Sequence, residues 1–154
     1  MGYQHILLAV DDSPIAIAAA DQTIILAKAL GSKVTIASVV VIDPLTSVSF
    51  YKSVPGVTDY YMEAKAHAKN ILAELGLKFT NLGIETHTKL LSGQSPAEAI
   101  SKLADELNVD LIVVGSHGRT GFKKAFIGSI AQEILTSSHV PVLVVKHTHK
   151  IRDE

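Results

Sequence analysis

The residues best suited to chemistry lie in one stretch, Gly115–Ala131, which reads GSHGRTGFKKAFIGSIA. An apolar run, Leu111–Val114, ends at this stretch, and a helical apolar pattern follows its last glycine break, Gly128-Ser129. Glycine permits backbone turns with positive φ and lets a ligand approach closely. The start of a helix adds unpaired N–H groups and the positive end of a dipole. The stretch is therefore predicted to bind an anion, and our first hypothesis is the phosphates of a nucleotide.

Two common nucleotide-binding motifs are missing from the chain. The turn after the first apolar run reads VDDSP and lacks the GxGxxG dinucleotide fingerprint. No glycine is followed by lysine, so the phosphate loop GxxxxGK[ST] is absent as well. Nicotinamide chemistry and hydrolysis of the P-loop type are therefore disfavoured. The spacing that remains is Gly115-x2-Gly118-x9-Gly128-Ser129.

Strands and helices alternate along the chain and must position this stretch. Apolar runs predict strands at His5–Val10, Lys33–Ile42, Ile84–Leu90, Leu111–Val114 and Val140–Lys146. Helical spacing of apolar residues predicts helices at Ile15–Leu30, Thr58–Leu75, Pro96–Leu107 and Gly128–Ser137. Ser13 and Ser95, each followed by proline, are predicted to be N-caps. Gly31 and Gly76 are predicted to end their helices.

This alternation favours a parallel sheet with helices on both faces. In such sheets ligands bind at the carboxyl ends of the strands, where the winding direction reverses. Asp11, the Ser38–Val41 region and Gly115 all lie at such ends, so we expect them to converge. The least regular segment, Asp43–Thr58, is typical of a functional or disordered loop. Ile84–Leu90 alternates in polarity, as a strand near the sheet edge would.

Composition narrows the class of protein further. The 154 residues are 47% hydrophobic and 19% charged, which fits a single globular domain over 1–154 with residues 147–154 as a frayed tail. With a net charge of −1 and no long basic run, a nucleic-acid partner is not expected. Without cysteine there are no disulfides. No apolar stretch approaches the ~20 residues of a membrane span and the N-terminus lacks a basic leader, so the expected location is the cytoplasm.

The glycine spacing, the aspartate that ends the first strand and the closing strand VPVLVVK together resemble the universal stress protein family. The match covers essentially the whole chain, from HILLAVDDS through SPAEAI to the last strand. The resemblance implies a five-stranded parallel sheet in an adenine-nucleotide α-hydrolase-like, Rossmann-like α/β fold that is usually dimeric. Family members that keep the glycine pattern bind ATP, and this sequence keeps every glycine. ATP, or another adenine nucleotide with Mg²⁺ bridging its phosphates, is therefore the ligand that the resemblance implies.

The site that the resemblance implies draws on several strand ends. Asp11 would lie near the ribose or adenine, and Val39 would line the adenine pocket. Gly118 would let the backbone approach the phosphates, and the N–H groups of Gly128 to Ala131 would face them. The full nucleotide-binding set is Ala9, Val10, Asp11, Val39, Val114, Gly115, Gly118, Arg119, Gly128, Ser129, Ile130 and Ala131. Ala9 and Ala131 depart from the proline and threonine of some members, so Ala131 would make its contact through the backbone.

Structural roles compete with several of these assignments. Asp11 or Asp12 could cap the first helix, and Ser129 could cap the last one. His117 could be a general base, although a histidine in an exposed loop is more often solvated. Arg119 could pair with phosphates or belong to a solvated loop face. No catalytic or metal-ligating residue is assigned.

Three functions remain open on the sequence. The first is an ATP-binding stress or signalling module with, at most, slow turnover. The second is a hydrolysing or adenylating enzyme of the adenine-nucleotide α-hydrolase type, but the SGGxDS-like loop of such enzymes is replaced here by VDDSP. The third is a nucleotide-free interaction module. Its last strand, Val140–Val145, is apolar on both faces and would pair across a homodimer.

Overall fold

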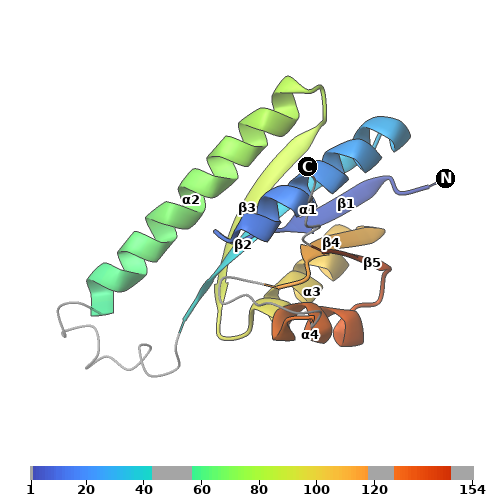
Figure 1. The fold of residues 1–154 in the computed structure, drawn as a ribbon. Helices are drawn as coiled ribbons and strands as arrows, with labels where there is room; N and C mark the ends of the chain where they lie inside the picture. The colour runs from blue at the N-terminus through green and yellow to red at the C-terminus, as the bar shows by residue number, and fades with distance from the viewer. Residues whose placement is uncertain (1, 43–56, 118–126, 147–154) are drawn as a thin grey trace, which may run out of the picture.

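The computed structural model describes residues 2–42, 57–117 and 127–146, without the side chains of residues 57–59. The strands are β1 (His5–Ala9), β2 (Lys33–Val41), β3 (Thr86–Gly93), β4 (Leu111–Gly115) and β5 (Val142–Val145). The helices are α1 (Pro14–Leu30), α2 (Val57–Asn81), α3 (Pro96–Leu107) and α4 (Ser129–Ser137) (Figure 1). None of these helices is long and apolar enough to cross a membrane.

All five strands are parallel and form one sheet in the order β3-β2-β1-β4-β5. The chain winds from β1 outward to β3, then crosses back to β4 on the other side of β1 and continues to β5. The winding direction therefore reverses between β1 and β4, which is the topological switch point of an open α/β sheet. The predicted parallel sheet is confirmed, with β3 at one edge and β5 at the other.

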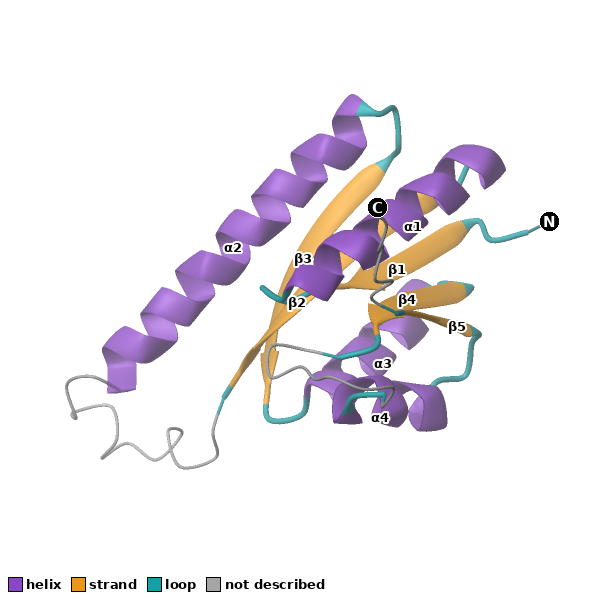
Figure 2. Cartoon of the chain, viewed as in Figure 1, coloured by secondary structure: helices purple, strands orange, loops and turns teal. Residues whose placement is uncertain are grey.

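Helices cover both faces of the sheet, as predicted (Figure 2). Successive strand residues point to opposite faces, so a strand covered on both sides must be apolar throughout. In β1, Ile6 and Leu8 join the core under α1 and α2, whereas Leu7 joins the core under α3 and α4. In β4, Val113 and Ile112 divide in the same way, and all five side chains are fully buried. This alternation explains why the runs HILLAV and LIVV read as continuous apolar strands.

Helix ends follow the sequence signals in most places. Ser95 is the N-cap of α3, where its hydroxyl accepts a hydrogen bond from the Glu98 N–H at 3.2 Å. Gly31 ends α1 in the left-handed conformation, with φ of 69°. Ser13 is the N-cap of α1, but its side chain makes no capping hydrogen bond.

Two predicted boundaries were wrong. Gly76 does not end α2, which continues to Asn81 because Phe79, one turn further on, is fully buried in the core. A Cβ at Gly76 would lie 3.2 Å from the Thr88 side chain, so this glycine serves close helix–strand packing. The strand predicted at Ile84–Leu90 instead runs from Thr86 to Gly93, because β2 extends far enough for Val41 to pair with Gly93.

Candidate functional site

The carboxyl ends of β2, β1 and β4 lie side by side at the switch point (Figure 1). Ala9, the last residue of β1, is level with Ala37 of β2 and Val114 of β4. The Val10 N–H continues the ladder by donating to the Ala37 carbonyl at 2.9 Å. The expected convergence of these strand ends is therefore confirmed.

Asp11 forms a local turn at the start of α1. Its Oδ1 accepts hydrogen bonds from the Ser13 N–H, at 2.9 Å, and from the Ser13 hydroxyl. Ser13 is buried, and its hydroxyl is thereby withdrawn from the helix N–H groups that it was predicted to cap. The bonds fix the orientation of the Asp11 carboxylate. They leave Oδ2 with no hydrogen-bond partner among the described residues.

Gly115 brings the end of β4 against the start of α1. A Cβ at this position would lie 2.8 Å from Cγ2 and 3.1 Å from Cγ1 of Ile15, and Ile15 is buried. A larger residue would push β4 and α1 apart exactly at the switch point, as overpacking generally does. Close approach of the two elements is therefore one reason for the first glycine of the pattern.

Gly128 connects the start of α4 to the end of β4. Its N–H donates to the Ser116 carbonyl, while the Ser116 N–H donates to the Val145 carbonyl at 2.8 Å. A Cβ on Gly128 would lie 3.1 Å from both the His117 Cα and the Ser116 carbonyl oxygen. These contacts leave almost no room for a side chain. The end of β4 and the start of α4 are therefore held close together.

The start of α4 presents backbone hydrogen-bond donors beside the end of β4. A helix leaves its first four N–H groups without intrahelical partners. The Gly128 N–H was predicted to face a ligand, but it donates to the Ser116 carbonyl instead. The first helical hydrogen bond, at 3.0 Å, runs from the Gln132 N–H to the Gly128 carbonyl. The N–H groups of residues 129–131 remain, and the helix dipole favours an anion there.

The remaining predicted residues divide into two groups. Val10, Val114 and Ala131 are buried core residues, so their side chains support the site from within. Ser129 and Ile130 are exposed in the first turn of α4. Gly128, rather than Ser129, is the N-cap, so the alternative capping role for Ser129 is wrong. Gly118 and Arg119 lie outside the described residues.

Sequence reasoning missed two features of this edge. Ser116 is almost completely buried, and its hydroxyl lies 3.1 Å from Nδ1 of His117, which is half-buried rather than in an exposed loop. Asp12 lies 3.5 Å from Nε2 of His67, which links the β1–α1 turn to α2. In the sequence, Ser116 and His117 were recognisable only as neighbouring residues, with no indication that their side chains interact. The second joins segments far apart in the chain and left no signal in the sequence.

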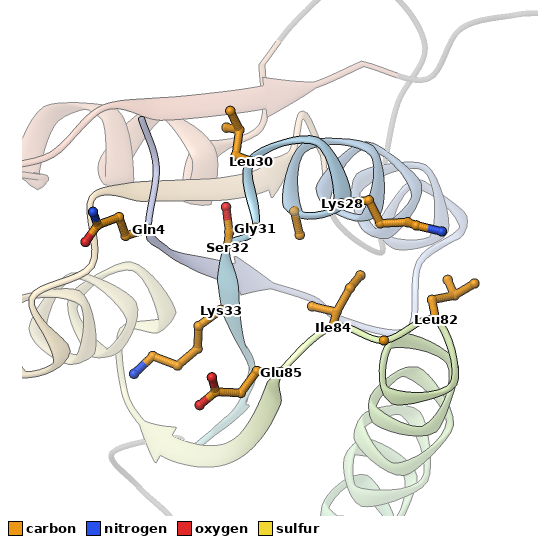
Figure 3. Close-up of a pocket in the computed structure, with 11 residues that line it drawn as sticks. Gln4, Lys28, Leu30, Gly31, Ser32, Lys33, Leu82, Ile84 and Glu85 are labelled. Carbon is orange, nitrogen blue, oxygen red and sulfur yellow. The ribbon is translucent and has the colours of Figure 1, made fainter. Parts of the chain in front are cut away.

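A hollow lies at the other end of the strands, on the amino-terminal side of the sheet. It has a volume of about 660 Å³ and is lined by the end of α1, the start of β2 and the α2–β3 turn (Figure 3). Lys28, Lys33 and Glu85 are among its lining residues, and none of the predicted site residues is. Helices α1 and α2 end here, so their dipoles present negative charge. Backbone N–H groups of residues that line it, such as Lys33 and Ile84, already donate to backbone carbonyls and are not available to phosphates.

An open parallel sheet whose winding direction reverses at a switch point defines the doubly wound class of α/β proteins. Within that class, the chain belongs to the universal stress protein family, whose family model matches residues 2–146. Universal stress protein MJ0531 of Methanocaldococcus jannaschii is 30% identical over 148 residues, which cover 96% of this chain and 85% of that protein. The resemblance inferred from the sequence is thereby confirmed at the level of the family.

Solved structures share the same fold. The structure of protein MJ0577, from the same organism, has a TM-score of 0.83 at 26% identity and covers 97% of this chain and all of its own. A universal stress protein solved in complex with cAMP has a TM-score of 0.66 at 25% identity, covering 97% of this chain and 100% of that one. Nucleotide binding is thus a property of a structural neighbour within the family.

Proposed function

We propose that this chain is an ATP-binding universal stress protein that acts as a nucleotide-dependent stress or signalling module. The observation that carries the proposal is that the carboxyl ends of β2, β1 and β4 lie side by side and that the Gly128 N–H, at the start of α4, is bonded to the Ser116 carbonyl just beyond β4. The spacing Gly115-x2-Gly118-x9-Gly128-Ser129 is the one that the family resemblance associates with ATP binding. The complex of a family neighbour with cAMP supports an adenine nucleotide as the ligand class.

In this proposal the nucleotide spans the switch point. Its adenosine lies against Asp11 and Val39, and its phosphates lie at the N–H groups of α4. The close packing at Gly128 supports this fit, because a Cβ there would fill the cradle beside Ser116 and His117. The described residues contain no group of three or more His, Asp or Glu side chains placed to hold a metal ion. Mg²⁺ is therefore assigned mainly to the phosphates and water.

Calorimetry with ATP and with adenosine tests the ligand and its orientation. Asp11→Ala is expected to weaken both ligands about tenfold, because it removes a charged hydrogen-bonding group at the adenosine end. Gly118→Val is expected to abolish ATP binding while the fold is retained. Asp21→Ala is the matched control, because Asp21 lies on the exposed face of α1 and forms a surface ion pair with Lys78, at 3.3 Å. Wild-type protein that binds neither ligand would contradict the proposal.

We also propose that the site binds ATP without fast turnover. Asp11 and Asp12 are the carboxylates that follow β1, and Oδ1 of Asp11 is already engaged by Ser13. Steady-state hydrolysis measures this directly. A kcat in the usual enzyme range of ~1–10³ s⁻¹ would favour the enzyme alternative instead.

The assembly and location of the protein complete the proposal. The last strand, β5, is an edge strand, and an exposed apolar edge tends to pair. A single-domain chain is proposed to form a cytoplasmic homodimer through Val140–Val145, without a nucleic-acid partner. Leu143→Asp should shift sedimentation from dimer to monomer, and an unchanged sedimentation coefficient would argue against this interface.

A further inference from the structure

Two ion pairs join α2 to the neighbourhood of α1. Asp12, in the turn between β1 and α1, lies 3.5 Å from Nε2 of His67, and Asp21 of α1 lies 3.3 Å from Nζ of Lys78. The earlier residue of one segment meets the earlier residue of the other, so α1 and α2 run in the same direction (Figure 1). The first of these pairs lies at the carboxyl ends of the strands, next to Asp11 in the sequence.

His67 marks the point at which α2 leaves the core. Among the described residues, the α2 side chains that belong to the core or pack against it all follow His67, namely Ile71, Leu72, Leu75 and Phe79. The helix begins at Val57, ten residues earlier, so about 15 Å of helix extends beyond the level of the β1–α1 turn. The sheet extends in the same direction, since Ala9 ends β1 opposite Ala37, whereas β2 continues to Val41. The first half of α2 and the ends of β2 and β3 therefore project on one side of the candidate site.

The contact with His67 directs one of the two carboxylates that follow β1. The positive end of the α1 dipole attracts both carboxylates. Asp11 turns back toward Ser13, whose N–H it accepts at 2.9 Å, whereas Asp12 is directed toward α2 by His67. One carboxylate is thus held from within the turn and the other from a distant segment. His67 thereby connects the projecting half of α2 to the turn that carries Asp11.

The charged groups around the His67 ring are carboxylates. Asp12 faces the ring from the turn, with Asp11 beside it, and Glu63 lies one helical turn earlier on α2. The other α2 residues three or four positions from His67 carry no charge, and neither do residues 14–20 of α1. Among the described residues, the side chains of β2 and β3 on the face toward α2 are uncharged as well.

The charge on the ring sets the strength of its contact with Asp12. Histidine changes its charge within the range of about pH 5 to 8. A protonated ring attracts the carboxylate through its full charge, whereas a neutral ring offers at most a hydrogen bond. Lowering the pH through this range therefore strengthens the link between α2 and the β1–α1 turn.

We propose that His67 is a positioning residue of the adenine-nucleotide site, which acts through Asp12, and that its protonation tightens binding of the nucleoside. The inference rests on the proposed function, which places the adenosine against Asp11 in the same turn. A turn already held to α2 loses less conformational freedom when the ligand binds. Because 24% of the Asp12 side chain and 60% of the His67 side chain are exposed, the effect is modest, about two- to fivefold in affinity.

The link to the turn is tested on the nucleotide-free protein by NMR. As the pH is lowered from about 8 to about 5.5, the ring protons of His67 titrate, and the backbone N–H resonances of Asp12 and Ser13 are expected to follow with the same midpoint. In His67→Gln, whose side chain does not titrate, these N–H resonances should lose that transition. Resonances that move equally in both proteins would overturn the link.

The effect on binding is tested by calorimetry with adenosine, which has no phosphate that titrates in this range. Wild-type protein is expected to bind adenosine about two- to fivefold more tightly at the acid end. His67→Gln should lose this gain and keep the weaker affinity, whereas His67→Lys, charged throughout, should keep the tighter affinity at every pH. In an Asp12→Asn background, His67→Gln should cause no further change, because the partner of the ring has already lost its charge.

His87→Gln is the matched control. Nε2 of His87 also lies 3.5 Å from a carboxylate, that of Glu85, and the His87 side chain is likewise 60% exposed, but the pair lies at the start of β3, at the opposite end of the strands. This variant should keep the wild-type pH profile. Thermal unfolding checks that each variant folds.

The outcomes separate the two proposals. If wild-type protein binds adenosine and His67→Gln keeps the full pH dependence, the role of His67 is wrong and the proposed function stands. A pH dependence lost equally in His87→Gln would also overturn that role, because it would indicate a general effect of charge. If wild-type protein binds neither ATP nor adenosine, the proposed function fails and the effect on binding fails with it, whereas the spectra of the turn still decide whether His67 is linked to it.

Discussion

The two ends of the parallel strands, referred to below as the amino-terminal edge and the carboxyl edge of the sheet, differ in how their polar groups are hydrogen-bonded. At the amino-terminal edge, the Asp110 carboxylate accepts the N–H groups of Gln4 and His5, each at 3.0 Å, and Nε2 of His5 lies 2.8 Å from the Thr35 hydroxyl. At the carboxyl edge, α4 begins with N–H groups that no helical carbonyl accepts. The described residues form a hollow of about 660 Å³ at the amino-terminal edge, whereas helix N–H groups without helical partners lie at the carboxyl edge. Unsatisfied donors therefore locate the candidate site better than the size of a cavity does.

The largest effect that tests this comparison is expected from Asp110→Ala. The substitution removes both hydrogen bonds to the start of β1 and should lower the free energy of unfolding by about 2 kcal/mol, since charged acceptors are involved. Chemical denaturation measures the loss. ATP affinity should not change, because the substitution lies at the opposite edge from the site.

Asp105→Ala serves as the control for that loss. Asp105 is an exposed residue of α3 whose carboxylate lies 3.3 Å from Nδ1 of His139. Surface pairs of this kind contribute at most ~1 kcal/mol, so this variant should remain close to wild type. A loss of ATP affinity in Asp110→Ala without a loss of stability would contradict the division of roles between the edges.

The next effect is expected from Gly128→Ala at the carboxyl edge. The added Cβ would meet backbone atoms of Ser116 and His117, which cannot move aside as the end of a side chain can. Overpacking of this kind costs about 1–3 kcal/mol, and relief of it should displace α4 from the end of β4. We expect calorimetry to show ATP affinity reduced about tenfold or more, with a smaller loss of stability.

Gly93→Ala is the matched glycine control at the same edge of the sheet. A Cβ there would meet nothing within 4 Å, and its φ is not in the left-handed region. ATP affinity and stability should both equal those of the wild-type protein. If Gly128→Ala behaves like Gly93→Ala, the connection between β4 and α4 does not form the phosphate end of the site.

What the sequence could predict about these edges depended on the range of the interactions. Apolar runs identify β1 and β4 because a strand buried on both faces cannot avoid being apolar, as Leu7 and Ile112 show on one face of the sheet. Ser95 was predicted as an N-cap because its partner, Glu98, is three residues away. Such short-range patterns can be predicted because the interacting residues are close together in the sequence.

Interactions set by tertiary packing were not predictable in the same way. Gly76 looks like a helix end, but it lies inside α2, which continues so that Phe79 is buried in the core. The Gly128 N–H was expected to face a ligand, but the Ser116 carbonyl reaches it first. In both cases the sequence singled out the glycine, but its structural role depends on a residue elsewhere in the fold. Gly118 and Arg119 stay predictions from spacing alone.

The smallest effect is a dependence of stability on pH at the amino-terminal edge. Burial, followed by the positive charge of Lys33, lowers the pKa of His5 below its ordinary value of 6.5, and the carboxylates of Asp110 and Glu85 oppose this only in part. A lowered pKa means that the folded chain resists a proton that the unfolded chain accepts. The stabilisation is therefore complete above pH 6.5 and is lost as the pH falls from there through the lowered pKa of folded His5.

Chemical denaturation of the wild-type protein and of His5→Gln isolates this effect. The measurements run from about pH 7.5 to about pH 5, because histidine titrates in this range. The wild-type free energy of unfolding should fall more steeply toward acid than that of the variant, while the other histidines contribute equally to both. ATP affinity should show the same pH dependence in the two proteins, because His5 lies at the edge opposite the site. Parallel stability curves would show that His5 does not titrate differently on folding. Diverging affinity curves would show that the two edges are coupled.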